Sequence, residues 1–132
     1  MKTPGIEDIL TIRLRRSKKS LLEAKAMIEN GFNNAALNHL YYACFYGATA
    51  LLLKKDILTK THAGVKQMLG LHYISTEVIS QEMGEFYSEL LQRRQNADYD
   101  DLAETEIETK LVKEYTILAN QFVETVQKIL EL

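Results

Sequence analysis

Arg94 is the residue of this sequence whose type and position point most clearly to chemistry. It follows Met83, Tyr87 and Leu90 at helical spacing, so it continues the apolar seam of a predicted helix. A guanidinium at such a position is held near the interior and needs an anionic partner. Its planar fork fits either a carboxylate or a phosphate. Two interpretations therefore stay open: an ion pair with a nearby acidic residue, or a site for an anionic ligand.

The segment after Arg94 is rich in acidic side chains and contains one tyrosine. Asp98 and Tyr99 follow Arg94 closely enough to orient its guanidinium or a bound phosphate. If the site is catalytic, Arg94, Asp98 and Tyr99 are the candidate catalytic residues. The acidic residues lack the glycine and the distal glutamate of an EF-hand loop, so no metal site is predicted. These acidic residues are Asp98, Asp100, Asp101 and Glu104.

Polar side chains also interrupt the apolar stretch 38–46. Polar tips on a buried helix require hydrogen-bond partners, and these could face the segment that carries Asp98 and Tyr99. For any single tyrosine the alternative is a place in the aromatic core with a satisfied hydroxyl group. Asn38 and Tyr42, together with His62, are the candidate ligand-binding residues. The three histidines are too scattered along the chain to predict a metal site.

Helical periodicity must position all of these residues, because strand signals are missing throughout. The predicted fold is all-α, an up-and-down bundle of four long helices plus one short helix in a single domain, 1–132. The helix from residue 33 is apolar nearly all round between Leu40 and Leu53, so it should be the central one. The predicted helices are 6–30, 33–55 with Asn33 as its cap, 61–69, one capped by Ser75 or Thr76, and one opened by a capping box of Thr105 and Glu108. Residues 96–103 are predicted to form a loop.

Bulk composition excludes several classes of protein. The net charge of −2 argues against a large electrostatic footprint for nucleic acid, although a small basic site is compatible with it. Cys44 is the only cysteine, which excludes an internal disulfide and a cysteine-based zinc site. The longest nearly apolar stretch, 40–53, is shorter than the roughly 20 residues of a membrane span. With no signal peptide visible, we expect a cytoplasmic protein without membrane contact.

A basic run near the N-terminus is interpreted as a solvated helix face. Arg15 and Lys19 share one side of the predicted helix, and Arg13 and Arg16 share another. RNA binding by this run is the less favoured alternative. The run consists of Arg13, Arg15, Arg16, Lys18 and Lys19.

Three motifs in order along the chain resemble the HEPN family of small helical-bundle proteins. The stretch 35–43 looks like the family's central-helix motif, in which small apolar residues run into Tyr-Tyr-Ala. Residues 61–65, which begin Thr-His, look like the start of its short helix. The stretch 94–99 looks like the Arg-x-x-Ala-Asp-Tyr ending of one branch of the family.

The resemblance implies several functional expectations. Many members are metal-independent ribonucleases, and many are toxins encoded beside a small nucleotidyltransferase that neutralises them. Others are adaptors or nucleotide-binding modules. In the ribonucleases an arginine holds the phosphate while a histidine exchanges protons, with two copies meeting across a homodimer.

This sequence departs from the ribonuclease pattern at one position. The residue at the place of the catalytic histidine is Tyr99, and no histidine follows Arg94. A tyrosine with a pKa near 10 is a poor general base at neutral pH. A cleavage reaction would therefore need Asp98 as its base, or His39 or His62 brought in from another helix.

Three functional hypotheses follow. The first is a component of a toxin–antitoxin-type pair that binds nucleotide, RNA or a nucleotidyltransferase partner around Arg94, Asp98 and Tyr99; Tyr99 could then serve as a modification acceptor. The second is an active metal-independent ribonuclease that uses Arg94 at a homodimer cleft. The third is a purely structural bundle. No glycine-rich phosphate loop or nucleophile elbow occurs, and no cofactor is predicted.

Overall fold

The most apolar helix, α2 (Asn33–Lys54), lies at the centre of the computed structural model, which describes residues 5–99 and 106–132. Twelve of its residues are buried. It packs against all the other α-helices of the described chain: α1 (Ile6–Glu29), α3 (His62–Leu69), α4 (Gln81–Tyr99) and α5 (Thr109–Leu130). The prediction that this helix is the central one is confirmed, and its cause is the lack of a polar face.

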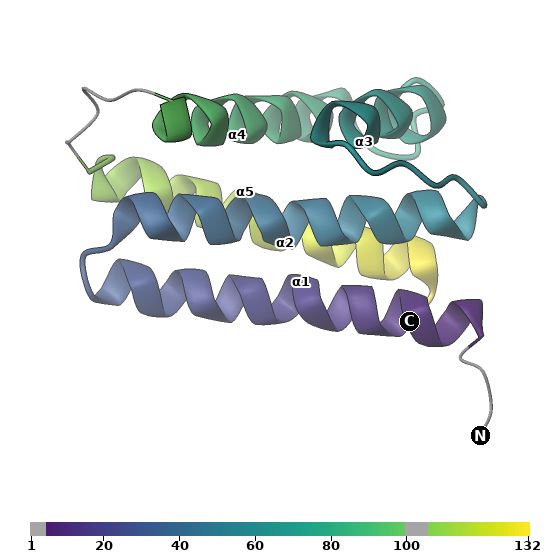
Figure 1. Cartoon of the computed structure of the whole chain (residues 1–132), viewed down its shortest axis with the longest axis horizontal. Helices are drawn as coiled ribbons and strands as arrows, with labels where there is room; N and C mark the ends of the chain where they lie inside the picture. Colours follow the sequence, from purple (N-terminus) through teal and green to yellow (C-terminus); the bar gives the residue numbers. More distant parts are fainter. Residues whose placement is uncertain (1–4, 100–105) are drawn as a thin grey trace.

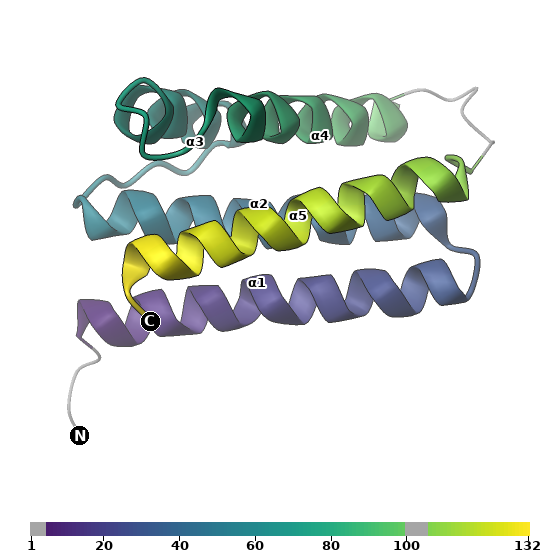
Figure 2. The same ribbon diagram turned by 180° about the vertical axis from the view of Figure 1, so that it is seen from behind.

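The long helices alternate in direction and form a bundle (Figure 1). Helices α1 and α2 form an antiparallel pair, α4 lies with α3 on the other side of α2, and α5 crosses the back of the bundle (Figure 2). No strand occurs in the described residues, so the all-α prediction is confirmed. No described helix is both long and apolar enough to cross a membrane.

The turn between α1 and α2 depends on Gly31 and on two asparagines. Gly31 adopts a φ of 79°, which a residue with a side chain rarely takes. Asn33 was predicted as the cap of α2, but it is the first helical residue and Phe32 occupies the cap position. The amide of Asn33 is instead committed elsewhere, because it donates hydrogen bonds to the carbonyl oxygen of Ile107 (2.9 Å) and to Oγ1 of Thr109 (3.0 Å).

These contacts also explain where α5 begins. Asn34 accepts a hydrogen bond from the backbone N–H of Ile107 (3.0 Å), and its own N–H donates to a carboxylate oxygen of Glu106 (2.7 Å). Residues 106–108 lie outside any helix, with Glu108 in an extended conformation, and α5 starts at Thr109. The predicted start of this helix at a capping box was therefore wrong: Glu108 makes no side-chain cap bond, and Thr105 lies outside the described residues.

The connection from α3 to α4 differs from the prediction. Helix α3 runs on into a π-helical turn, η1 (Gly70–Ile74). Ser75 and Thr76 do not cap α4, because their hydroxyls donate backward to the carbonyl oxygens of Leu71 (2.6 Å) and His72 (2.9 Å). The cap is Ser80, whose Oγ accepts the N–H of Met83 at 3.2 Å.

Helix α4 extends further than predicted, to Tyr99, whereas a loop was predicted from Asn96. Its apolar seam packs onto the core through Tyr87, Leu90 and Leu91, which are all buried. Arg94 therefore lies a full turn before the helix ends, where α4 still runs beside α2. The bundle thus brings the guanidinium of Arg94 to the polar positions of the central helix.

Candidate functional site

Arg94 reaches from α4 to two polar side chains of α2. Its Nε donates to Oδ1 of Asn38 at 2.9 Å, and one terminal nitrogen donates to the hydroxyl of Tyr42 at 3.1 Å. Asn38 and Tyr42 are one helical turn apart, so both face the same side of α2. All three residues are half-buried. The two bonds fix the plane of the guanidinium, which restricts where its remaining N–H groups can point.

Two tyrosine rings support the cation. The guanidinium carbon of Arg94 lies 5.3 Å from the ring centroid of Tyr41 and 5.1 Å from that of Tyr42. Both distances fall within the range of cation–π attraction. A guanidinium supported in this way can present N–H donors to the oxygens of an anion.

His62 is brought into the same cluster by the start of α3. Thr61 caps this helix, with its Oγ1 accepting the N–H of Gly64 at 2.9 Å. The ring of His62 packs against Phe45, with centroids 4.7 Å apart, and its Nδ1 lies 2.6 Å from the hydroxyl oxygen of Tyr41. That hydrogen bond orients the ring. Its Nε2 has no hydrogen-bond partner among the described residues.

The protonation states at the site follow from burial and from the arginine. Burial raises the pKa of Tyr41 to about 12, so the hydroxyl stays protonated at neutral pH. Burial, and then the charge of Arg94, lower the pKa of His62 below its ordinary value of 6.5. His62 is therefore neutral at pH 7. A neutral imidazole beside a fixed guanidinium is a pair that can bind a phosphate and exchange a proton.

The candidate residues predicted from sequence fall into two groups. The structure places Asn38, Tyr42 and His62 around Arg94; whether they bind a ligand stays a prediction. Asp98 and Tyr99 belong to the last turn of α4, but their side chains lie outside the described residues. The same holds for the segment 100–105, which includes the other acidic residues of the predicted loop. Among the side chains that are described, no cluster of histidine, cysteine or carboxylate groups could hold a metal ion.

Of the two histidines considered as partners for Arg94, only His62 meets it through shared neighbours. The ring of His62 and the guanidinium of Arg94 both pack on the rings of Tyr41 and Tyr42. Sequence reasoning named Tyr41 within the stretch 38–46 but assigned it no contact with His62. The Thr-His pair at a helix start fixes the histidine on the first turn, but it does not tell which residue of another helix the ring meets.

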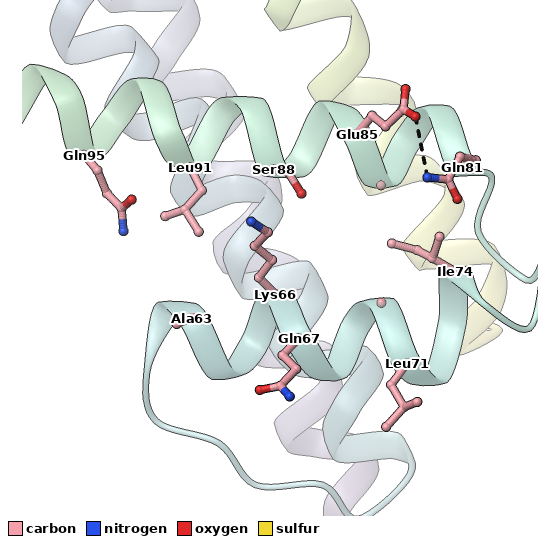
Figure 3. A pocket seen from close by; sticks show the side chains of 12 residues that line it. Ala63, Lys66, Gln67, Leu71, Ile74, Gln81, Glu85, Ser88, Leu91 and Gln95 are labelled. Carbon is pink, nitrogen blue, oxygen red and sulfur yellow. Dashed lines mark hydrogen bonds between the residues drawn. The ribbon is translucent and has the colours of Figure 1, made fainter.

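A separate groove of about 820 Å³ runs between α4 and the α3–η1 segment (Figure 3). Lys66 projects into it from α3, while Ser88 and Leu91 face it from α4. None of Arg94, Asn38, Tyr42 or His62 lines this groove. The cluster around Arg94, which joins α4 to α2, is therefore distinct from the groove between α4 and the α3–η1 segment.

Comparison with known proteins adds the family context. Residues 11–132 match the HEPN domain family. A UPF0332 protein of Thermotoga maritima is 33% identical over 95% of this chain and 93% of its own length. A Methanocaldococcus jannaschii protein named "Putative toxin" is 33% identical over 87% of this chain and 84% of its own length. A second protein of that organism with the same designation is 36% identical, over 66% of this chain and 59% of its own length.

Proposed function

This chain belongs to the HEPN domain family, and on that basis we propose that it is the toxin component of a toxin–antitoxin-type pair that binds a phosphate of RNA at Arg94. The observation that carries the proposal is the fixed guanidinium of Arg94, held by Asn38 and Tyr42 over two tyrosine rings. The designation of two relatives as toxins supports the cellular role.

The chemistry of the cluster favours RNA over a free carboxylate ligand. Arginine contacts phosphate in a planar, two-pronged geometry, and exposed faces of tyrosine and histidine rings stack on unpaired bases. The half-buried ring of Tyr42 lies directly beside the guanidinium, and the half-buried rings of Phe45 and His62 pack on that of Tyr42. A nucleotide unit would therefore find its phosphate and its base partner within one cluster.

His62 favours a second candidate function, which is metal-independent cleavage of the bound RNA. In this reaction a neutral His62 accepts the proton of the ribose 2′-hydroxyl as the 2′-oxygen attacks phosphorus. The bond from phosphorus to the 5′-oxygen breaks, that oxygen takes a proton from water, and His62 returns its proton to the hydroxide that remains. Arg94 stabilises the charge that develops on the phosphoryl oxygens. The products are a 2′,3′-cyclic phosphate end and a 5′-hydroxyl end.

The proposed protein partners follow from the family resemblance. We propose that two copies associate so that both Arg94 side chains line one cleft, and that a small nucleotidyltransferase is the cognate partner. Tyr99 is the proposed hydroxyl acceptor of a modification by that partner. Sedimentation of the pure protein tests the dimer. Intact-mass measurement of the chain after incubation with the partner and nucleotide, with Tyr99→Phe as the control, tests the modification.

Expression in a bacterial host tests the toxic function directly. The parent should arrest growth, whereas Arg94→Ala and Arg94→Lys should not, because lysine cannot reproduce the two-pronged contact. Arg93→Ala is the matched control, since Arg93 is an exposed neighbour that pairs with Glu89 at 3.9 Å. Equal toxicity of the parent and the Arg94 variants would refute the proposal.

Purified protein separates binding from cleavage. The parent and the same variants are incubated with a mixed RNA pool in EDTA and followed on a gel. Cleavage by the parent, lost in both Arg94→Ala and His62→Gln, supports the ribonuclease. RNA binding without cleavage limits the function to the first proposal.

A further inference from the structure

One stripe of the central helix is left open by the bundle. Tyr42, Phe45, Tyr46 and Thr49 recur at helical spacing on α2, and all four are half-buried. The three aromatic rings form a continuous row: the centroids of Tyr42 and Tyr46 are 6.0 Å apart, and those of Phe45 and Tyr46 are 6.2 Å apart. The row begins at Arg94 and leads away from it along α2 toward α1.

Two arginines of α1 stand at the far end of this row. The guanidinium carbon of Arg16 lies 6.0 Å from the ring centroid of Tyr46, and a terminal nitrogen of Arg13 donates to the carbonyl oxygen of Thr49 at 3.1 Å. Arg13 is half-buried and so departs from the expected solvated helix face, whereas Arg16 is exposed as expected, with its guanidinium beside a ring of α2. Both side chains lie against α2.

The charge of this arginine pair is not balanced by carboxylates. In the part of the chain that the structure describes, neither Arg13 nor Arg16 forms an ion pair. Burial and the nearby charge of Arg16 lower the pKa of Arg13, which means that its environment disfavours the cation. Two positive charges that lie close together without an acidic partner favour the binding of an anion.

A hollow of about 210 Å³ lies beside the pair, between α1, α2 and the connection to α3. The hydroxyl of Thr49 already donates to the carbonyl oxygen of Tyr46 at 2.8 Å, whereas Arg13 and Lys60 supply positive charge to the wall and Thr59 supplies a hydroxyl group. These groups suit the oxygens of a phosphate. The distance along α2 from Tyr42 to Thr49 corresponds to roughly 10 Å of helix rise.

We propose that this surface is a second RNA contact, in which a single strand bound at Arg94 passes over Tyr42, Phe45 and Tyr46 and places a neighbouring phosphate against Arg13, Arg16 and Lys60. The inference rests on the proposed function and adds the path and the strandedness of the RNA. Unpaired bases stack on aromatic rings, whereas paired bases are hidden inside a duplex. A second copy is a poorer occupant, because a twofold contact here would bring identical arginine pairs together.

Fluorescence anisotropy with a labelled single-stranded RNA tests the path. The double variant Arg13→Gln/Arg16→Gln should weaken binding at least tenfold and reduce the salt slope by about 0.7, the value for one lost phosphate contact on a single strand. The matched control is Arg15→Gln/Lys18→Gln, which removes the same charge from exposed positions on the far side of α1. Tyr46→Leu should weaken binding roughly fivefold or more with no change in the salt slope.

The outcomes distinguish a failure of the proposed RNA path from a failure of the proposed function. If the Arg13/Arg16 variant matches its control while Arg94→Ala loses binding, the path is refuted and the proposed function stands. If Arg94→Ala retains both binding and toxicity, the proposed function fails as well. A change in sedimenting mass of the Arg13/Arg16 variant, without loss of RNA affinity, would show instead that the surface is a contact between copies. Equal affinity for duplex and single-stranded RNA would also overturn the proposal.

Discussion

The ring nitrogen Nδ1 of His62 lies 2.6 Å from the hydroxyl oxygen of Tyr41, and the ring of Tyr41 also supports the guanidinium of Arg94. One buried tyrosine therefore connects a proton-exchanging group from α3 with a phosphate-binding group from α4. The predictions below test how each contact of this cluster contributes.

Asn38→Ala should lower RNA affinity by about tenfold, because it removes the acceptor that orients Nε of Arg94. A hydrogen bond to a charged group contributes about 1.5–3 kcal/mol, which corresponds to that factor or more. Anisotropy with single-stranded RNA measures the effect. The control is Asn120→Ala on α5, whose amide bonds only the backbone of its own helix. Equal losses in the two variants would mean that Asn38 does not position Arg94.

Tyr42→Phe should weaken RNA binding slightly, whereas Tyr42→Leu should weaken it strongly. Phenylalanine keeps the ring under the guanidinium and loses only the 3.1 Å hydrogen bond, while leucine loses both contacts. The extra loss with leucine should be about 0.5–2 kcal/mol of binding free energy. Tyr73→Phe, which removes a hydroxyl bond to the carbonyl oxygen of Leu51 away from the site, controls for general destabilisation. A Phe variant as weak as the Leu variant would contradict cation–π support.

The stability of the protein should depend on pH through His62. Its pKa in the folded state lies below the ordinary 6.5, so in the pH window just below 6.5 the unfolded chain binds more protons than the folded one. The free energy of unfolding should therefore rise with pH through that window and fall as the solution is acidified. Urea unfolding at several pH values measures this slope. It should diminish in His62→Gln and persist in His72→Gln.

Gly64→Ala should disturb the site although Gly64 is not one of its residues. A Cβ at this position would lie 2.7 Å from Oγ1 of Thr61 and would also collide with the side chain of Thr59. The Thr61 cap would be displaced, at a cost of about 1 kcal/mol, and His62 on the first turn of α3 would shift with it. Thermal unfolding should show the loss of stability, and RNA cleavage should fall more than RNA binding. Gly70→Ala is the control, because no atom lies within 4 Å of a Cβ there.

Local patterns of the sequence predict much of the architecture. The recurrence of apolar residues every three to four positions determines α1, α2, α4 and α5 to within a few residues, and the missing polar face of α2 determines that it is central. The spacing that places Arg94 on the seam of α4 also predicts that it points inward. Asn38 and Tyr42 could be named because polar tips on a buried helix require partners.

The remaining features depend on packing between segments far apart in the chain. The start of α5 is decided by Asn33 and Asn34, more than 70 residues away, and the contact of Arg13 with Thr49 joins two helices. His62 meets Tyr41 only because α3 folds back onto α2. Periodicity reports which face of a helix is apolar, but it carries no information on which other helix covers that face. The sequence by itself therefore determined the helices and the inward arginine, and the tertiary structure alone decided which histidine and which basic residues share a surface with it.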